Sequence, residues 1–251
     1  MLVVTEKRHG INIVDCWFAD EKVKLDGIVR YKQAPVSFED GFEEFPSLLT
    51  DLTEDEETIL SHIAKDTKYQ IRRASKEGIV FEGYTGKDIS DDMLEAYYNF
   101  FEEFWKSKNI DYSESEKSKQ LSEAKKYRDA NAFALTMAKL CEKVLVYHTY
   151  IVGEDFARSH QSASQFRTDE EVTSRIIGYG NRFLHYQDMI YFKNAGKKFY
   201  DWGGAGTSDE VASITEFKKA FGGTPVIQYN GECVNGVAAK MYRKATQMVS
   251  H

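Results

Sequence analysis

Residues 158–223 decide the fold, through RSHQSASQFR (158–167), RIIGYGNRFLHYQDMIYFKNAG (175–196), KKFYDWGGAG (197–206) and FKKAFGG (217–223). Their pattern predicts a strand, a glycine turn, a helix, a second strand, a second glycine turn and a helix. In the first turn, Arg175-x-x-Gly178-x-Gly180 would let backbone N–H groups approach a ligand closely. A helix N-terminus behind such a turn favours phosphate or pyrophosphate. The spacing differs from the G-x-G-x-x-G of dinucleotide-binding folds.

Length and composition bound the class of protein. The 251 residues suffice for one large α/β domain with an N-terminal extension. Hydrophobic residues at 42% and aromatic residues at 14% exclude global disorder. The net charge of −7 gives no general attraction to DNA or to an anionic membrane, although a local basic patch is compatible with it. The apolar runs are short and MLVVTEKRHG is unlike a signal peptide, so we expect a cytoplasmic protein without membrane insertion.

The chain offers no sequence signature of a metal centre or a disulfide framework. Cys16, Cys141 and Cys233 are far apart and odd in number. We expect buried, unreactive thiols and no metal site.

The remaining elements predict a mixed α/β sheet covered by helices. Residues 36–52 are acidic and predict a loop with a short turn of helix, whereas the apolar spacing from 55 to 77 predicts one helix with Thr53 as its cap. The strands that flank the 175–196 segment should be parallel, because a helix connects them. We expect an N-terminal β-rich extension over 1–52, packed on a main domain over 53–251. Strands are predicted within 1–35, 79–84, 132–140, 143–153, 156–166 and 224–231, and further helices over 91–108, 114–129 and 234–248.

Two further motifs resemble a known family. Tyr200-Asp201-Trp202-Gly203-Gly204 followed by EFKKAFGG (216–223) resembles the "YD-x-GG … FK-x-x-FGG" signature of FemAB-like (peptidoglycan-bridge) transferases, a branch of the GNAT (N-acetyltransferase) superfamily. KYQIRRASKEG (68–78) is similar to the "R-x-x-I-R-R-A-x-K-x-G" helix of that branch. The resemblance covers about residues 55–230. It implies a GNAT-like central mixed sheet flanked by helices.

The resemblance also implies a co-substrate. In the GNAT superfamily, R/Q-x-x-G-x-G/A binds the pyrophosphate of acyl-CoA through backbone amides. Acyl-CoA, acetyl-CoA in particular, would then be held by Arg175, Ile177, Gly178, Tyr179, Gly180 and Asn181. FemAB-like enzymes that use aminoacyl-tRNA commonly have two GNAT-type domains and often lack such a loop, and this chain is too short for two full copies. Aminoacyl-tRNA therefore stays the less favoured donor, and the net charge of −7 argues in the same direction.

Candidate catalytic residues lie on the two strands. N-acyl transfer needs a neutral acceptor amine and hydrogen-bond donors for the oxyanion. Alternation places Arg158, His160, Ser162 and Ser164 on one face, where His160 is a candidate base and Ser162 a candidate substrate ligand. His160 is alternatively a histidine hydrogen-bonded within the sheet. Asp201 is a second candidate for amine activation, or else caps its loop.

A cationic helix face is the last candidate. The 55–77 helix places Lys65, Lys68, Arg72 and Lys76 at spacings of three and four, hence on one face. Lys68, Arg72 and Arg73 are candidates for binding an acceptor phosphate, as in a nucleotide sugar. The alternative is a solvated helix end that suits the helix dipole.

These observations predict an N-acyltransferase that moves an acyl group from acyl-CoA to an amine by direct attack. The acceptor would be small or related to the cell envelope: an amino sugar, a nucleotide sugar or an amino acid. The alternatives are aminoacyl transfer from aminoacyl-tRNA to a peptidoglycan precursor and a non-catalytic module that binds acyl-CoA or a nucleotide.

Overall fold

A computed structural model describes residues 1–165, 172–206 and 209–249. Over these residues, ten strands form one mixed sheet in the order β1-β2-β3-β10-β4-β9-β8-β7-β6-β5. The strands are β1 (Leu2–Arg8), β2 (Ile11–Trp17), β3 (Gly27–Ala34), β4 (Glu43–Asp51), β5 (Ile79–Thr85), β6 (Phe133–Leu140), β7 (Lys143–Val152), β8 (Phe156–Ser164), β9 (Phe199–Gly204) and β10 (Thr224–Asn235). Neighbours are antiparallel except for the parallel pairs β2–β3 and β8–β9. The predicted mixed α/β architecture is confirmed.

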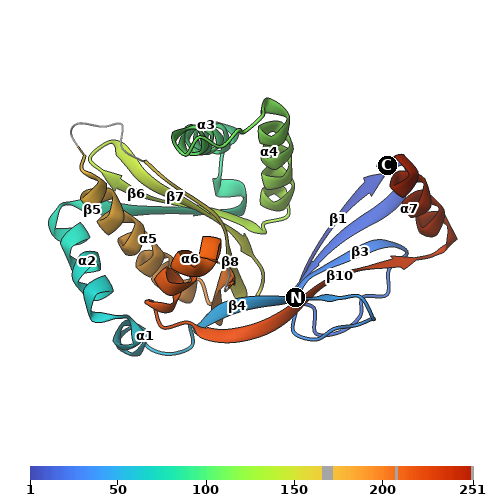
Figure 1. Ribbon diagram of the computed structural model, residues 1–251, viewed down its shortest axis with the longest axis horizontal. Coiled ribbons are helices and arrows are strands. Elements are labelled where there is room, and N and C mark those ends of the chain that lie inside the picture. The colour runs from blue at the N-terminus through green and yellow to red at the C-terminus, as the bar shows by residue number, and fades with distance from the viewer. Residues whose placement is uncertain (166–171, 207–208, 250–251) are drawn as a thin grey trace.

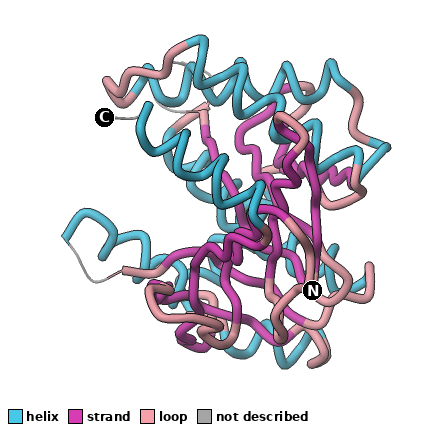
Figure 2. Tube along the Cα trace, turned by 90° about the vertical axis from the view of Figure 1, so that its right-hand side faces the viewer, coloured by secondary structure: helices cyan, strands magenta, loops and turns pink. Residues whose placement is uncertain are grey.

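Helices cover both faces of the half of the sheet that consists of β4, β9, β8, β7, β6 and β5 (Figure 1, Figure 2). They are α1 (Glu56–His62), α2 (Lys65–Lys76), the short 3₁₀ helix η1 (Gly86–Asp88), α3 (Asp91–Ser107), α4 (Glu114–Asp129), α5 (Ser174–Asn194) and α6 (Asp209–Lys219). The last helix, α7 (Val237–Val249), lies on the other half. One apolar core lies between the sheet and α1, α2 and α5, and a second lies between the opposite face and α3 and α4. No described helix is long and apolar enough to span a membrane.

The N-terminal strands and the C-terminal segment form one lobe together. β10 pairs with β3 along one edge and with β4 along the other, and α7 packs on β2, β3 and β10. Figure 1 shows these elements to the right of the helix-covered half. The lobe therefore combines residues 1–34 with 224–249, although the sheet continues without interruption into the rest of the chain. A division of the folding units at residue 52 stays a prediction.

Three local expectations are wrong. Residues 43–51 form β4, in the middle of the sheet, where we expected a loop. The predicted 55–77 helix is two helices broken at Ile63 and Ala64, where the Ala64 amide donates to the Ala220 carbonyl at 2.8 Å. Asp55, not Thr53, caps α1 by accepting from the Thr58 amide at 2.8 Å. The first two departures are caused by partners distant in the sequence, and the third by competition between two nearby capping residues.

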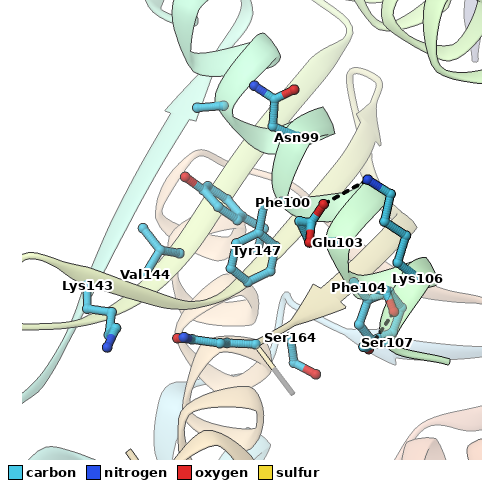
Figure 3. A pocket seen from close by; sticks show the side chains of 12 residues that line it. Asn99, Phe100, Glu103, Phe104, Lys106, Ser107, Lys143, Val144, Tyr147 and Ser164 are labelled. Carbon is cyan, nitrogen blue, oxygen red and sulfur yellow. Dashed lines mark hydrogen bonds and ion pairs between the residues drawn. The ribbon is translucent and has the colours of Figure 1, made fainter. Parts of the chain in front are cut away.

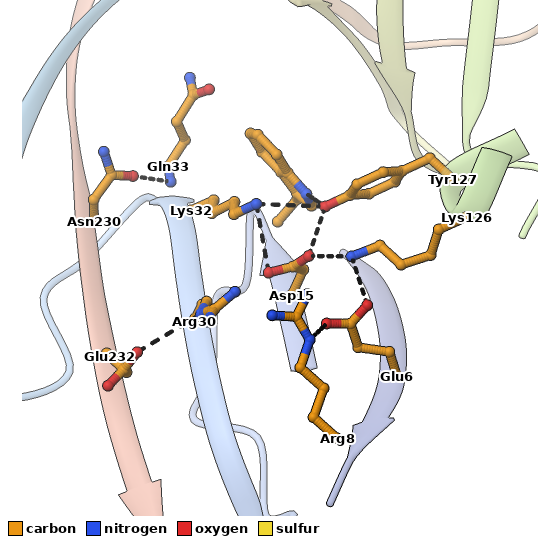
Figure 4. Close-up of polar contacts among 11 residues, drawn as sticks. Glu6, Arg8, Asp15, Arg30, Lys32, Gln33, Lys126, Tyr127, Asn230 and Glu232 are labelled. Carbon is orange, nitrogen blue, oxygen red and sulfur yellow. Dashed lines mark hydrogen bonds and ion pairs between the residues drawn. The ribbon is translucent and has the colours of Figure 1, made fainter. Parts of the chain in front are cut away.

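A buried carboxylate joins the N-terminal lobe to α4 (Figure 4). Asp15 on β2 accepts from the Tyr127 hydroxyl and from Lys126 Nζ, both at 3.0 Å, and lies 3.4 Å from Lys32 Nζ. Trp17 Nε1 donates to the same Tyr127 oxygen at 3.0 Å. Burial alone would raise the pKa of Asp15, but Lys32 and Lys126 hold that pKa below its ordinary value. The carboxylate therefore stabilises the contact between the lobe and the helix as long as it is ionised.

We expect Asp15→Asn to lower the free energy of unfolding by about 2 kcal/mol, because it removes the carboxylate shared by two partly buried ammonium groups and leaves Lys126 with only the longer contact to Glu6 at 3.7 Å. Because the folded-state pKa of Asp15 is depressed, the wild-type contribution is present above pH about 4 and is lost as the pH falls through the folded pKa. Urea denaturation at pH 7 measures the loss. Asp155→Asn is the control: this carboxylate pairs with Lys198 at the surface, where the loss should stay under about 1 kcal/mol. Equal losses of stability in the two variants would contradict the role of Asp15 in stabilising the contact between the lobe and α4.

Candidate active site between diverging strands

The parallel strands β8 and β9 pair at one end only. Their register consists of Phe156 with Phe199, Ala157 with Tyr200 and Arg158 with Asp201. Beyond this point β8 stays paired to β7 as far as Ser164, and β9 stays paired to β4 as far as Gly204. The two strands therefore separate, and none of the described strands pairs with the backbone edges that face the gap. The backbone N–H and C=O groups along these edges can form hydrogen bonds with polar groups of a ligand, such as a carbonyl.

Asp201 and Gly203 shape the point of separation. The buried Asp201 carboxylate accepts from the Gly203 amide at 2.6 Å, from the Ser47 hydroxyl at 3.0 Å and from Gln33 Nε2 at 2.9 Å. Gly203 has φ +70°, and a Cβ there would lie 3.1 Å from the Ser159 carbonyl oxygen. Because glycine tolerates both the backbone angle and the close approach, the chain turns here.

Asp201 is enclosed by these partners and does not line the cavity in the gap. Burial raises its pKa, while the Arg158 guanidinium and the hydrogen bonds oppose the rise. The predicted alternative of a residue that holds its loop fits this geometry. A direct role in activating the amine does not fit, because the carboxylate is fully buried behind the strand.

A β-bulge in β8 overturns the predicted alternation. Thr149 pairs with Gln161 and Tyr150 with Ser159, so His160 is an extra residue. Gln161 reaches the α3–α4 face, where its side chain meets Tyr97 and Gln120. Ser162 pairs with His148 and lies on the α5 face. Arg158 and Ser162 are therefore on opposite faces.

The gap holds a cavity of about 640 Å³. It lies between β8, β9, α5 and α6, with α3 at its rim. Its lining combines cations, hydroxyls and aromatic rings, and includes no aspartate or glutamate among the described residues: Phe104, Lys108, Arg158, Ser159, His160, Gln161, Ser162, Ser164, Asn181, His185, Trp202, Gly203, Gly204, Ser213, Ile214, Phe217 and Lys218. Although the whole chain is acidic, this cleft is cationic.

Two further cavities adjoin the cleft. One, of about 610 Å³, lies between α3 and the β7 end of the sheet and shares Phe104 and Ser164 with the cleft. Figure 3 shows Phe100 and Tyr147 pointing into it from these two elements, with ring centroids 5.1 Å apart. The other, against α3 and α4, shares His160, Gln161 and Ser162 with the cleft. The separation of β8 and β9 is thus approached from both faces of the sheet.

His160 lines the cleft, but its surroundings disfavour the predicted role of general base. Burial, the Arg158 guanidinium and Lys32 lower the pKa of His160 to about 3. Arg158 Nη1 lies 3.4 Å from His160 Nδ1, so the neutral ring accepts there and carries its proton on Nε2. This tautomer offers a hydrogen-bond donor at Nε2, where a base would need a lone pair.

Lys218 on α6 is a cleft residue that the sequence interpretation missed. Its Nζ donates to the Gly204 carbonyl at 2.7 Å. Burial and the nearby Arg158 guanidinium lower the pKa of Lys218 to about 8, against an opposing effect of Asp201. The FKKAFGG segment was part of the family resemblance, but the sequence alone did not distinguish Lys218 from its exposed neighbour Lys219.

The glycine motif lies inside a helix. α5 begins at Ser174, with Thr173 as its cap, so Gly178 and Gly180 fall within its first turns. The predicted glycine turn is wrong, and the amides of Ile177 to Asn181 have partners within the helix. Gly180 allows close packing on Ile79 and Leu145. Arg175 is exposed on the first turn, Ile177 is buried, Tyr179 is half-buried, and Asn181 alone of this group lines the cleft.

The cationic side chains of α2 lie outside the described cavities. Lys68 donates to the Ser61 carbonyl at 3.3 Å, and Arg73 pairs with Glu77 one helical turn away. Arg72 is exposed. A role for Lys68, Arg72 and Arg73 in binding an acceptor phosphate stays a prediction.

A buried polar cluster lies behind the cleft, between α5 and the sheet. His148, His185 and Asp188 are all buried, and their ligating atoms lie within 4.8 Å of one another. His148 Nδ1 is 2.7 Å from Asp188 Oδ2, and the two imidazole rings are tilted by 35° with centroids 4.1 Å apart. Both ring nitrogens of His148 are already engaged, Nδ1 with Asp188 and Nε2 with Asn181, and His185 Nδ1 contacts the Tyr200 hydroxyl. We therefore read the cluster as a hydrogen-bonded network.

Comparisons with known proteins identify solved structures with a similar fold. No family model and no curated protein sequence matches the chain. The fold is similar to that of FemX, with a TM-score of 0.65 and 11% identity over 96% of this chain and 85% of that one. It is also similar to L-PGS from Bacillus licheniformis (TM-score 0.54, 12% identity, 99% and 86% covered). The C-terminal domain of a putative lysylphosphatidylglycerol synthetase from Agrobacterium fabrum has a similar fold (TM-score 0.54, 12% identity, 98% of this chain and 85% of that one covered).

At this identity the likeness shows the fold alone, and the predicted FemAB-like fold is confirmed as the fold shared with FemX. The alignment with FemX covers 96% of the chain, so it includes the N-terminal lobe that the sequence motifs did not reach.

We expect Gly203→Ala to cost more stability than Gly196→Ala. Both positions have positive φ, +70° and +77°, so each should lose about 1 kcal/mol through backbone strain. A Cβ at 196 meets nothing within 4 Å, whereas at 203 it lies 3.1 Å from the Ser159 carbonyl oxygen. Urea denaturation of both variants measures the difference. Equal losses would show that the turn in β9 does not depend on this contact.

Proposed function

We propose that the cleft between β8 and β9 is the reaction site of an N-acyltransferase. The observation that carries the proposal is the separation of the two parallel strands, whose cationic, hydroxyl-bearing cleft is approached from both faces of the sheet. An acyl donor and an amine acceptor can meet there from opposite sides. Bringing two reactants together in this way removes much of the entropic barrier to a bimolecular reaction.

The lining suits direct attack of the amine on an activated carbonyl. Attack converts the carbonyl oxygen into an oxyanion, which preorganised donors stabilise. The Lys218 ammonium, His160 Nε2–H and the unpaired edge of β8 supply such donors at the cleft. Among the described residues, no hydrogen bond joins a cleft serine to a histidine, as an activated serine nucleophile would require. The chemistry therefore favours direct transfer over a covalent acyl-enzyme.

Acyl-CoA is the first donor to test, with aminoacyl-tRNA as the second candidate. The exposed Arg175 at the start of α5 and the cationic cleft suit the phosphates of either donor. One observation favours the second: the glycine motif lies within α5, so its amides cannot cradle a pyrophosphate as a glycine turn would. The FemAB-like fold points in the same direction. The acceptor is an amine of a small or cell-envelope-related molecule.

A transfer assay tests the proposal. Carbon-14-labelled acetyl-CoA and alanyl-tRNA are each incubated with the protein and with glucosamine, free amino acids or a nucleotide-linked muramoyl peptide. Transfer of label to an amine from either donor supports the proposal and identifies the donor. Retention of all label on both donors, with a folded protein, would overturn it for these substrate classes.

Lys218→Met should reduce the transfer rate about 100-fold, the usual loss when one oxyanion donor is removed. Lys219→Met on the next residue is the control, because Lys219 is exposed and pairs with Glu216. Since the pKa of Lys218 is about 8, its ammonium form is lost above that pH, and the wild-type rate should fall there. Lys218→Arg keeps its charge and should lose this alkaline limb. An unchanged pH profile in Lys218→Arg would rule out the assignment.

A further inference from the structure

A continuous hydrogen-bond chain runs from the cleft into the core. His185 Nδ1 lies 3.1 Å from the Tyr200 oxygen, which lies 2.9 Å from the Tyr150 oxygen. The Tyr150 hydroxyl donates to Asp188 Oδ2 at 2.5 Å, and His148 Nδ1 lies 2.7 Å from the same oxygen. His148 Nε2 in turn lies 3.0 Å from Asn181 Oδ1. His185 and Asn181 line the cleft, so both ends of the chain reach it.

Counting protons fixes the direction of the chain. A phenol has one proton, and Tyr150 gives its proton to Asp188. The bond between the two phenols must therefore use the Tyr200 proton, with Tyr150 as acceptor. Since Tyr200 has no further proton, the bond between Tyr200 and His185 must use a proton on His185 Nδ1. Neutral His185 then carries its lone pair on Nε2, and among the described residues the hydrogen bond of this ring is the one that Nδ1 makes to Tyr200.

We propose that His185 Nε2 takes the proton of the acceptor amine, and that Tyr200 and Tyr150 relay a proton from His185 Nδ1 to Asp188. The proposal rests on the proposed function, because it assigns the base for amine acylation in the same cleft. His185 is the catalytic residue of this step. The two tyrosines and Asp188 act through it.

The step balances in atoms and charge. The ammonium of the acceptor forms a new H–Nε2 bond on His185 while the Nδ1–H bond breaks. That proton passes to the Tyr200 oxygen, the Tyr200 proton passes to Tyr150, and the Tyr150 proton passes to Asp188 Oδ2. An ammonium and a carboxylate become an amine and a carboxylic acid. After acyl transfer the stored proton returns to the departing sulfur or oxygen, and the second proton of the attacking nitrogen leaves to water.

The relay solves an electrostatic problem of the cleft. Burial lowers the pKa of His185 well below its ordinary value, and His148, Lys218 and Arg182 lower it further. A protonated His185 is therefore disfavoured, but in the relay the ring loses one proton as it gains another. Burial raises the pKa of both tyrosines, so their hydroxyls stay protonated and can conduct. Tyr150 and His148 both contact Asp188 Oδ2, whereas Oδ1 has no hydrogen-bond partner among the described residues.

The tautomer provides a test that needs no substrate. Nitrogen-15 NMR of protein labelled at histidine should show His185 neutral between pH 5 and 8, with a protonated Nδ1 and an unprotonated Nε2. In Tyr200→Phe, which removes the acceptor of the Nδ1 proton, this pattern should shift toward the Nε2–H form. An Nε2–H tautomer or an imidazolium in the wild type at pH 6 would overturn the proposal.

Kinetics test the relay itself. With the donor and amine that the transfer assay identifies, Tyr200→Phe and Tyr150→Phe should each lower kcat/KM about 100-fold at pH 7, within the usual range for general base catalysis. Tyr191→Phe is the matched control, because its hydroxyl contacts Thr85 and lies outside the chain. The loss relative to wild type should shrink as the pH rises toward the pKa of the amine, since a free amine needs no base. A loss that is the same at all pH values would show a structural role and overturn the relay.

The two proposals fail in different ways. If the wild type transfers label and the tyrosine variants match Tyr191→Phe, the relay is wrong while the transferase function stands. If no amine is acylated by the wild type, the proposed function fails even where NMR shows the expected tautomer, and the relay then has no amine to serve. Unchanged melting temperatures confirm that the variants are folded.

Discussion

The arrangement of the cleft depends on the separation of β8 from β9 immediately after Arg158 and Asp201. Parallel strands joined through a helix would ordinarily continue to pair. Here the Asp201 carboxylate holds the Gly203 amide, and the left-handed backbone of Gly203 turns β9 away from β8. The β8 bulge at His160 adds to the effect, because a bulge bends the strand that contains it. Both strands keep their outer partners, so the sheet opens without losing continuity.

This opening explains why residues of different elements share one cleft. α5 follows β8 and packs on the sheet through Gly180, which places Asn181 and His185 beside the gap. α6 follows β9 and brings Lys218 over the same gap, where it donates to Gly204. The cleft thus gathers its cations from β8, from α6 and from the end of α3, while the acidic residues that give the chain its net charge are not found among its described lining residues. A whole-chain charge of −7 says little about such a local site.

The sequence predicted those parts of the fold that rest on local pattern. The parallel strands around the 175–196 helix and the FemAB-like fold are confirmed. The central strand β4 escaped prediction because Pro46 and the acidic residues around it have low strand propensity, and its pairing with β9 and β10 is long-range. The bulge at His160 reversed the assumed face of Ser162, since one extra residue shifts a period-two pattern. His148 and Tyr150 carried no motif, and only the sheet register brings them to Asp188.

The buried network behind the cleft is costly to place in a core. Each polar group there loses water, and a network is tolerated only when its members satisfy one another. When buried polar groups have a purely structural role, replacing them by apolar residues of the same volume often leaves the protein equally stable. Here the chain of partners starts at a cleft residue, His185, and returns to another, Asn181, after passing through a carboxylate. A chain with both ends at the cleft fits the proposed proton relay, while the apolar residues around it already form the core.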